Sequence, residues 1–324
     1  IFILLFRIFA IRKKYEIMKF YKTWNPIFNN IQSSIPNILP KVKKSNQFHL
    51  LKIYNRTYEK KALDSQTNLI TIANYLDIEN IAKNMLNYKN SIYKIVAIKT
   101  IGYLQLKKYS STLNELIEHE NIVVTLIAIQ SLIKISSKNL DKLIPLLLCK
   151  EECNMNKIIL ILSNIDENIL YESIKKIVNT THIELLPRLI KLFSLIGKSN
   201  ANEEAKKILL KYQEIEILST ALLFISEEKE KDFLFSFIEH DSWIIRMQAI
   251  KALSSMLLIE DIKTISKLLL DSSWWVRHHT AYAIVSIKSI SENYLNNLEE
   301  VLGDKFAVDA LKVARKKRDL FDSI

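Results

Sequence analysis

The chain of 324 residues is poor in glycine and proline, with three glycines and five prolines. Tight turns between strands usually need these residues, so their scarcity argues against a β-rich fold. Phosphate-binding loops and the nucleophile elbow of hydrolases are built on glycine, and none of the spacings GxGxxG, GxxxxGK[ST] or GxSxG occurs. The sequence therefore predicts no nucleotide or other cofactor and no set of catalytic residues.

Metal-ligating residues are also sparse. The two cysteines, Cys149 and Cys153, are spaced to share one face of a helix, but two thiols are half a zinc site and no histidine lies at ligand spacing beside them. His278 and His279 are neighbours, and adjacent side chains on a helix point about 100° apart. We expect ordinary thiols, a reducing compartment and no metal site.

The net positive charge of the chain is concentrated in residues 1–60. Of the 46 Lys and Arg residues, twelve lie in residues 1–60, which leaves 34; of the 35 acidic residues, two lie there, which leaves 33. Only eight of the basic residues are arginine. A helical array that follows a nucleic-acid backbone should carry positive charge along its length, and this chain beyond residue 60 is nearly neutral. The distribution argues against nucleic acid as the partner.

A five-position pattern recurs along the chain, with large, small, small, large and large residues at i, i+4, i+7, i+8 and i+11. Two copies lie near the C-terminus and two nearer the N-terminus, and the offset between copies is the same in both pairs. The copies are Tyr93, Ala97, Thr100, Ile101, Leu104; Val124, Ala128, Ser131, Leu132, Ile135; Ile245, Ala249, Ala252, Leu253, Met256; and Val276, Thr280, Ala283, Ile284, Ile287. This spacing predicts one stripe of a helix that another helix approaches closely, and a fixed period of about 30 residues predicts an all-α solenoid of stacked helical hairpins.

The N-terminal segment Ile1–Ile11 has ten apolar residues interrupted by Arg7, followed at once by Arg12, Lys13 and Lys14. Eleven helical residues rise about 16 Å, roughly half of a bilayer core. One interpretation is the cytoplasmic end of a transmembrane helix, because the cationic flank obeys the positive-inside rule and attracts an anionic membrane surface. The other is a short amphipathic or buried helix. We favour the first, which predicts the cytoplasmic side of a bacterial inner membrane, with a cytoplasmic protein as the alternative.

The remaining segments follow from composition and periodicity. Residues 12–45 are expected to be a basic juxtamembrane stalk broken at Trp24-Asn25-Pro26, Pro36 and Pro40, and residues 46–86 a helical capping region. The helical repeats should occupy residues 87–302. Residues 303–324 are expected to form a last helix with a basic patch at 315–318.

The sharpest motif is DSSWWVRHHTAYAI at residues 271–284, with a weaker copy, HDSWIIRMQAIKAL, at residues 240–253. It resembles the HEAT-like repeat of phycobilisome lyases, a family whose fold is a right-handed α-α superhelix. In that family an Asp and an Arg brace neighbouring repeats. The resemblance implies that Asp271 with Arg277, and Asp241 with Arg246, are bracing residues.

A narrower resemblance extends over most of the chain. It rests on Trp24, Pro26, Leu39, Pro40, Trp274–Arg277, Asp304, Ala307, Asp309 and Leu311. This set is similar to bacterial membrane-anchored HEAT proteins that are often encoded beside a processive family-2 glycosyltransferase. The chain departs from that group in having His278-His279 where an aromatic residue and an arginine are expected. The resemblance implies a membrane glycosyltransferase as the protein partner.

Three functions follow as hypotheses. The favoured one is a non-catalytic scaffold that docks a protein partner on Trp243, Trp274, Trp275 and His278, because tryptophan is typical of interface hot spots. The alternative is a nucleic-acid-binding protein of the alkylpurine DNA glycosylase type, a HEAT-like family that holds damaged DNA in a basic cleft with Trp, Asp and Arg. The residues that suggest it here are Trp274, Trp275, Asp271 and Arg277. A phycobilin lyase is the third, although no residue pattern indicates a bilin site.

Overall fold

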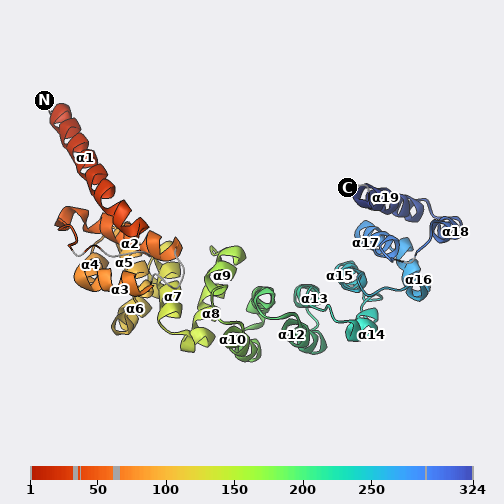
Figure 1. Ribbon diagram of the computed structural model, residues 1–324. Coiled ribbons are helices and arrows are strands. Elements are labelled where there is room, and N and C mark those ends of the chain that lie inside the picture. The colour runs from red at the N-terminus through yellow and green to blue at the C-terminus, as the bar shows by residue number, and fades with distance from the viewer. Residues whose placement is uncertain (1, 32–35, 37, 61–65, 289, 323–324) are drawn as a thin grey trace. The chain divides into compact units, whose positions relative to one another are not determined.

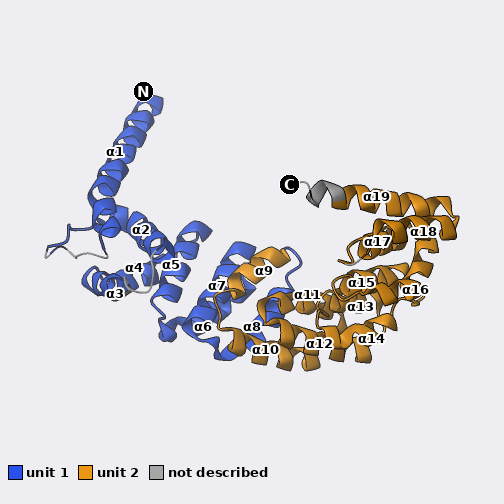
Figure 2. Cartoon of the chain, turned by 45° about the vertical axis from the view of Figure 1, so that its right-hand side comes forward, with its two compact units in different colours: residues 1–152 blue, residues 153–324 orange. Residues whose placement is uncertain are grey.

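The computed structural model describes residues 2–31, 36, 38–60, 66–288 and 290–322, and every regular element in these ranges is a helix. The chain divides into two compact units, residues 1–152 and residues 153–324 (Figure 2). The predicted all-α fold is confirmed. Outside the described residues lie Ile1, residues 32–35 and 37 of the expected stalk, residues 61–65 of the expected capping region, residue 289 of the expected repeats and residues 323–324 of the expected last helix.

Unit 1 is built around two long helices that pack on each other, α5 and α7. Its α-helices are α1 (Phe2–Asn29), α2 (Gln47–Lys60), α3 (Gln66–Tyr75), α4 (Ile78–Leu86), α5 (Ser91–Tyr103), α6 (Ser110–Glu115), α7 (Ile122–Ile135) and α8 (Leu140–Leu148) (Figure 1). α2 and α4 pack on α5, and α6 packs on α7. Each long helix is therefore covered by a shorter neighbour in the chain.

Unit 2 repeats this arrangement with α11, α13, α15, α17 and α19. Its α-helices are α9 (Met155–Leu162), α10 (Glu167–Thr180), α11 (Leu186–Ile190), α12 (Lys198–Lys211), α13 (Ile215–Leu222), α14 (Lys231–Phe235), α15 (Trp243–Leu253), α16 (Ile262–Ile265), α17 (Trp274–Val285), α18 (Glu292–Leu302) and α19 (Lys305–Asp322) (Figure 1). The helices α11, α13, α15, α17 and α19 each pack on the next, while α12, α14 and α18 cover α13, α15 and α19. Stacked helical hairpins are the HEAT-like arrangement that the period predicts.

The small positions of the repeated pattern lie where helices approach each other. Ala97 and Ala128 are completely buried, and Ser131 of α7 donates a 3.0 Å hydrogen bond to the carbonyl of Ile98 in α5. A Cβ added to Gly102 would lie 2.7 Å from Cβ and 2.9 Å from Cα of Ser131. The two backbones are therefore too close for any larger side chain, which is the physical reason for the small residues.

This close approach predicts the effect of one methyl group. Gly102→Ala should destabilise the protein by about 1–2 kcal/mol, because overpacking against backbone exceeds the gain of up to about 1 kcal/mol that alanine brings to a helix. Gly197→Ala is the control, since its new Cβ would meet only the carboxylate end of the Glu167 side chain, at 2.6 Å. Thermal unfolding of both variants tests the prediction, and equal melting temperatures would contradict it.

The helix α1 continues through Trp24-Asn25-Pro26, the first of the breaks expected in the stalk. Phe20, Trp24 and Phe28 recur every fourth residue and are buried, and the centroids of successive rings lie 5.9 and 6.0 Å apart. The Phe28 ring also packs edge-on against Tyr54 of α2. Pro26 lies in the last turn of α1, where it removes a single helical hydrogen bond, and this packed aromatic face outweighs that loss. The prediction of a break at Trp24-Asn25-Pro26 is wrong.

The apolar start of α1 leaves the membrane prediction open. In the described residues no single helix is both long and apolar enough to cross a membrane; only Ile122–Ile135 together with Ser137–Leu148, bent by 117°, meets both conditions as a pair. That residues 1–11 are the end of a membrane-spanning helix stays a prediction.

Candidate functional site

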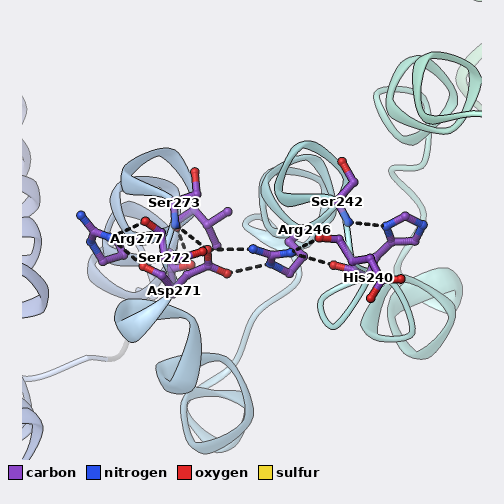
Figure 3. Close-up of polar contacts among 10 residues, drawn as sticks. His240, Ser242, Arg246, Asp271, Ser272, Ser273 and Arg277 are labelled. Carbon is purple, nitrogen blue, oxygen red and sulfur yellow. Dashed lines mark hydrogen bonds and ion pairs between the residues drawn. The ribbon is translucent and has the colours of Figure 1, made fainter.

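A buried ion pair joins two successive repeats of unit 2 (Figure 3). Arg246 of α15 donates from Nε to Oδ2 of Asp271 at 2.7 Å and from Nη2 to Oδ1 at 2.8 Å. Only 14% of the arginine side chain and 6% of the aspartate side chain are exposed. This two-point contact ties α15 to the turn that precedes α17, so it sets where α17 begins.

Each arginine also closes the turn before its own helix. Arg246 Nη1 donates to the carbonyls of His240 and Asp241, both at 2.8 Å. Arg277 Nη1, one repeat later, donates to the carbonyls of Asp271 at 2.6 Å and Ser272 at 3.1 Å (Figure 3). The guanidinium thus satisfies carbonyls in the turn, and the repeat of the contact follows the repeat of the sequence.

The predicted bracing pairs need correction. Arg246 binds the carboxylate of Asp271, not that of Asp241, and Arg277 binds the backbone carbonyl of Asp271, not its carboxylate. The residue equivalent to Asp271 is His240: Oδ1 of Asp271 accepts the Ser273 N–H at 2.8 Å, and Nδ1 of His240 accepts the Ser242 N–H at 3.0 Å. Asp241 comes one position after His240 in the turn, and its side chain is exposed.

In unit 1, different residues occupy the positions that correspond to Arg246, Arg277 and Asp271. Lys94 and His119 are 25 residues apart, as are Arg246 and Asp271, and Nζ of Lys94 lies 3.3 Å from Nε2 of His119. Thr125 stands in the arginine position and donates to the carbonyls of Ile117 at 3.1 Å and His119 at 3.2 Å. Sequence reasoning missed these residues. Lys94 and Thr125 directly follow the first member of a copy of the pattern, and His119 precedes such a member by five residues, as Asp271 does.

The ion pair with Arg246 changes the acidity of Asp271. Burial by itself raises the pKa of this carboxyl, but the hydrogen bonds from Arg246 and the Ser273 N–H outweigh it and hold the pKa below the usual 3.8. The carboxylate stays ionised at neutral pH and its oxygens are occupied. The glycosylase hypothesis needs the Asp271 carboxylate for chemistry, whereas here Arg246 and the Ser273 N–H already occupy it.

The three tryptophans of unit 2 lie at helix starts and are about half exposed. Trp243 is the first residue of α15 and Trp274 and Trp275 are the first two of α17. Their exposed fractions are 39%, 52% and 50%, so none is a core residue. Trp243 and Trp274 occupy the same position in successive repeats of stacked helices, which places them on the same edge of the array.

An aromatic stripe runs along α17 at every fourth residue, formed by Trp274, His278 and Tyr282. The ring of Trp274 stacks on His278 with centroids 4.6 Å apart, and His278 contacts Tyr282 at 4.6 Å. Trp275 meets Trp274 edge-on at 4.8 Å, and Nζ of Lys317 from α19 lies 4.9 Å from the Tyr282 ring centroid. The stacking orders the exposed rings before anything binds.

The stripe ends at a groove of about 830 Å³ along α15 and α17. Its polar lining includes Lys251, Ser254, Ser255, His279, Tyr282 and Lys288. Burial first, and then the charge of Lys251, lower the pKa of His279; burial and Lys317 lower that of His278. Both rings are therefore mostly neutral at pH 7, and lysines supply the positive charge here. Sequence reasoning missed this groove because its lining comes from three separate segments.

The predicted basic patch at 315–318 is largely paired. Arg315 forms an ion pair with Glu299 at 2.7 Å and another with Glu292, which also binds Arg318. These contacts fix α19 on α18, so the two arginines are structural. Lys317 is the member that turns toward α17.

The described cysteines differ in burial. Cys149 is exposed and Cys153 is buried, and burial raises the pKa of the Cys153 thiol. Neither is oxidised to a disulfide.

Comparisons with known proteins give one structural likeness. No family model matches the chain, and no curated protein matches it either. One similar solved structure is the complex of CpcE and CpcF of phycocyanin lyase from Nostoc sp. PCC7120, at 12% identity and a TM-score of 0.28, covering 86% of this chain and 99% of that chain.

The lyase finding corrects one prediction. The sequence analysis predicted a chain that is not an enzyme, whereas the similar structure is that of an enzyme complex. That finding overturns the prediction of a non-catalytic chain. At a TM-score of 0.28 the likeness does not assign lyase activity to the chain.

Proposed function

We propose that the chain is a HEAT-like scaffold that binds a protein partner through unit 2, on the docking surface formed by Trp243, Trp275 and the aromatic stripe Trp274–His278–Tyr282. The observation that carries the proposal is the exposure of three tryptophans, each between 39% and 52%, at the starts of two stacked helices. Exposed tryptophan is costly in water, and clustered tryptophan is typical of binding hot spots.

The surroundings of the docking surface suggest the chemistry of the partner. The rings offer apolar contact area that is already ordered by stacking, which lowers the entropy cost of binding. Lys251, Lys288 and Lys317 surround the stripe and its groove, whereas Glu228 is the acidic residue of the groove lining. A partner segment with an aromatic or aliphatic anchor followed by carboxylates fits this surface best.

The second part of the proposal is contact with an anionic membrane surface through α1. Phe2, Phe6 and Phe9 of α1 are 89%, 72% and 64% exposed, and Arg12, Lys13 and Lys14 follow them. Apolar residues with a cationic flank are what a membrane interface binds. The inner membrane and a membrane glycosyltransferase are the location and partner that the sequence resemblance implies.

Affinity capture of the protein from gently solubilised membranes tests the proposal. Wild type should retain a stoichiometric partner, identified by mass spectrometry, and the double variant Trp274→Ala/Trp275→Ala should lose it. The control Leu160→Ala/Leu210→Ala removes two side chains that are 68% and 66% exposed on α9 and α12, and should keep the partner.

Two results would count against the proposal. Retention of the partner by the tryptophan variant would place the binding site elsewhere. Capture of nucleic acid from the soluble fraction, with an affinity that falls steeply as salt rises, would favour the nucleic-acid alternative.

A further inference from the structure

Unit 1 has a cationic groove between α1 and the segment 40–46, with a volume of about 750 Å³. Arg12 and Lys19 line it from the helix, and Lys41 and Lys43 line it from the segment. Trp24, which is 2% exposed, forms part of its wall. Two chain segments thus bring four cations around one opening.

The charges in this cationic groove are poorly balanced. Glu16 is its acidic lining residue and lies 3.5 Å from Lys43, both side chains being largely exposed. Within the described ranges, Arg12, Lys19 and Lys41 form no ion pair. Like charges gathered at one opening repel each other, so an anion bound among them would be stabilised by all of them.

The position of the groove along α1 matches the depth of a lipid headgroup. A lipid phosphate lies just outside the hydrocarbon core, at the level where the apolar side chains of an inserted helix end. Ile11, 60% exposed, is the last apolar residue of that stretch and the first residue of the groove lining. Tyr15, 64% exposed, follows one turn later in the lining, and tyrosine is enriched at the membrane interface. An α1 inserted up to Ile11 holds the groove among the headgroups.

We propose that this groove binds the phosphate of an anionic phospholipid. The inference deepens, and rests on, the proposed membrane contact of α1. The Arg12 guanidinium offers two parallel donors to phosphate oxygens, and Lys19 and Lys41 act as point charges. The groove converts a general attraction to the inner leaflet into recognition of one lipid headgroup at a fixed place on the chain.

Vesicle flotation of the full chain tests the groove, with vesicles of phosphatidylcholine alone and with added phosphatidylglycerol. The groove variant is Lys19→Gln/Lys41→Gln. The control variant is Lys22→Gln/Lys44→Gln, which takes one exposed lysine from α1 and one from the following segment, each three residues further along and outside the groove lining. Both variants remove the same charge from the same two elements.

The two variants distinguish specific binding of the lipid headgroup from general attraction to the negative surface potential of the vesicle. A lysine that senses only the surface potential contributes about fivefold to binding. We expect the groove variant to lose at least about tenfold more affinity for phosphatidylglycerol vesicles than the control variant does. Equal losses would overturn the groove and leave the membrane contact standing.

Two further outcomes overturn the inference in other ways. No binding of wild type to either vesicle would overturn the membrane contact of α1 and the groove together. Binding of inorganic phosphate without vesicles, lost in the groove variant while vesicle binding is unchanged, would identify a soluble phosphate ligand in place of a lipid.

Discussion

Asp271→Asn is expected to lower the free energy of unfolding by about 3 kcal/mol, because it leaves the Arg246 guanidinium buried without a counter-ion. The estimate is at the lower end of the range for broken buried pairs, since Arg246 keeps its bonds to the carbonyls of His240 and Asp241. Urea unfolding followed by tryptophan fluorescence is a suitable measurement. Trp243, Trp274 and Trp275 lie beside the brace, and only Trp24 lies in unit 1.

The matched control is Asp241→Asn, which removes an exposed carboxylate from the residue that follows His240. It should change stability by less than about 0.5 kcal/mol. Comparable losses in both variants would mean that Asp241 also carries the brace and that the pairing described above is incomplete.

The pH dependence provides an independent check on the ion pair. The pKa of Asp271 is lowered in the folded protein, so the pair contributes its full stability above the unfolded pKa of about 3.9. That contribution is lost as pH falls through the lower, folded pKa. The stability difference between wild type and Asp271→Asn should therefore be constant near neutral pH and shrink below about pH 4. A difference that persists undiminished in acid would contradict the ion pair.

Trp274→Ala and Trp275→Ala are each expected to weaken binding of the captured partner by about 2–4 kcal/mol, as hot-spot tryptophans do. Each change should cost only about 1–1.5 kcal/mol of stability, because half of each side chain is already exposed in the free protein. Surface plasmon resonance against the purified partner measures the first quantity, and urea unfolding measures the second.

The ratio of the two effects decides the role of these rings. A loss of stability near about 3–5 kcal/mol with unchanged affinity would make them core residues and remove the docking surface from unit 2. The control for affinity is Leu160→Ala/Leu210→Ala, which should bind the partner as wild type does.

Local sequence rules succeeded for features that one stretch of chain carries by itself, such as the spacing of large and small residues along a helix. The recurring large and small residues predicted helices that pack closely, and Gly102 against Ser131 shows the physical reason. Pro26 was misjudged because its cost depends on burial of Trp24 and Phe28 against other elements, which local rules do not contain.

The sequence by itself determined an all-α fold of stacked hairpins, the concentration of net positive charge in residues 1–60 and the candidate tryptophans. Periodicity and composition are properties of the chain. Only the tertiary structure decided that Arg246 pairs with Asp271, that the tryptophan rings are half exposed, and that Lys19 and Lys41 share one groove. Each of these depends on distances between residues from separate segments. Such distances are set by the packing of whole helices, which no local pattern encodes.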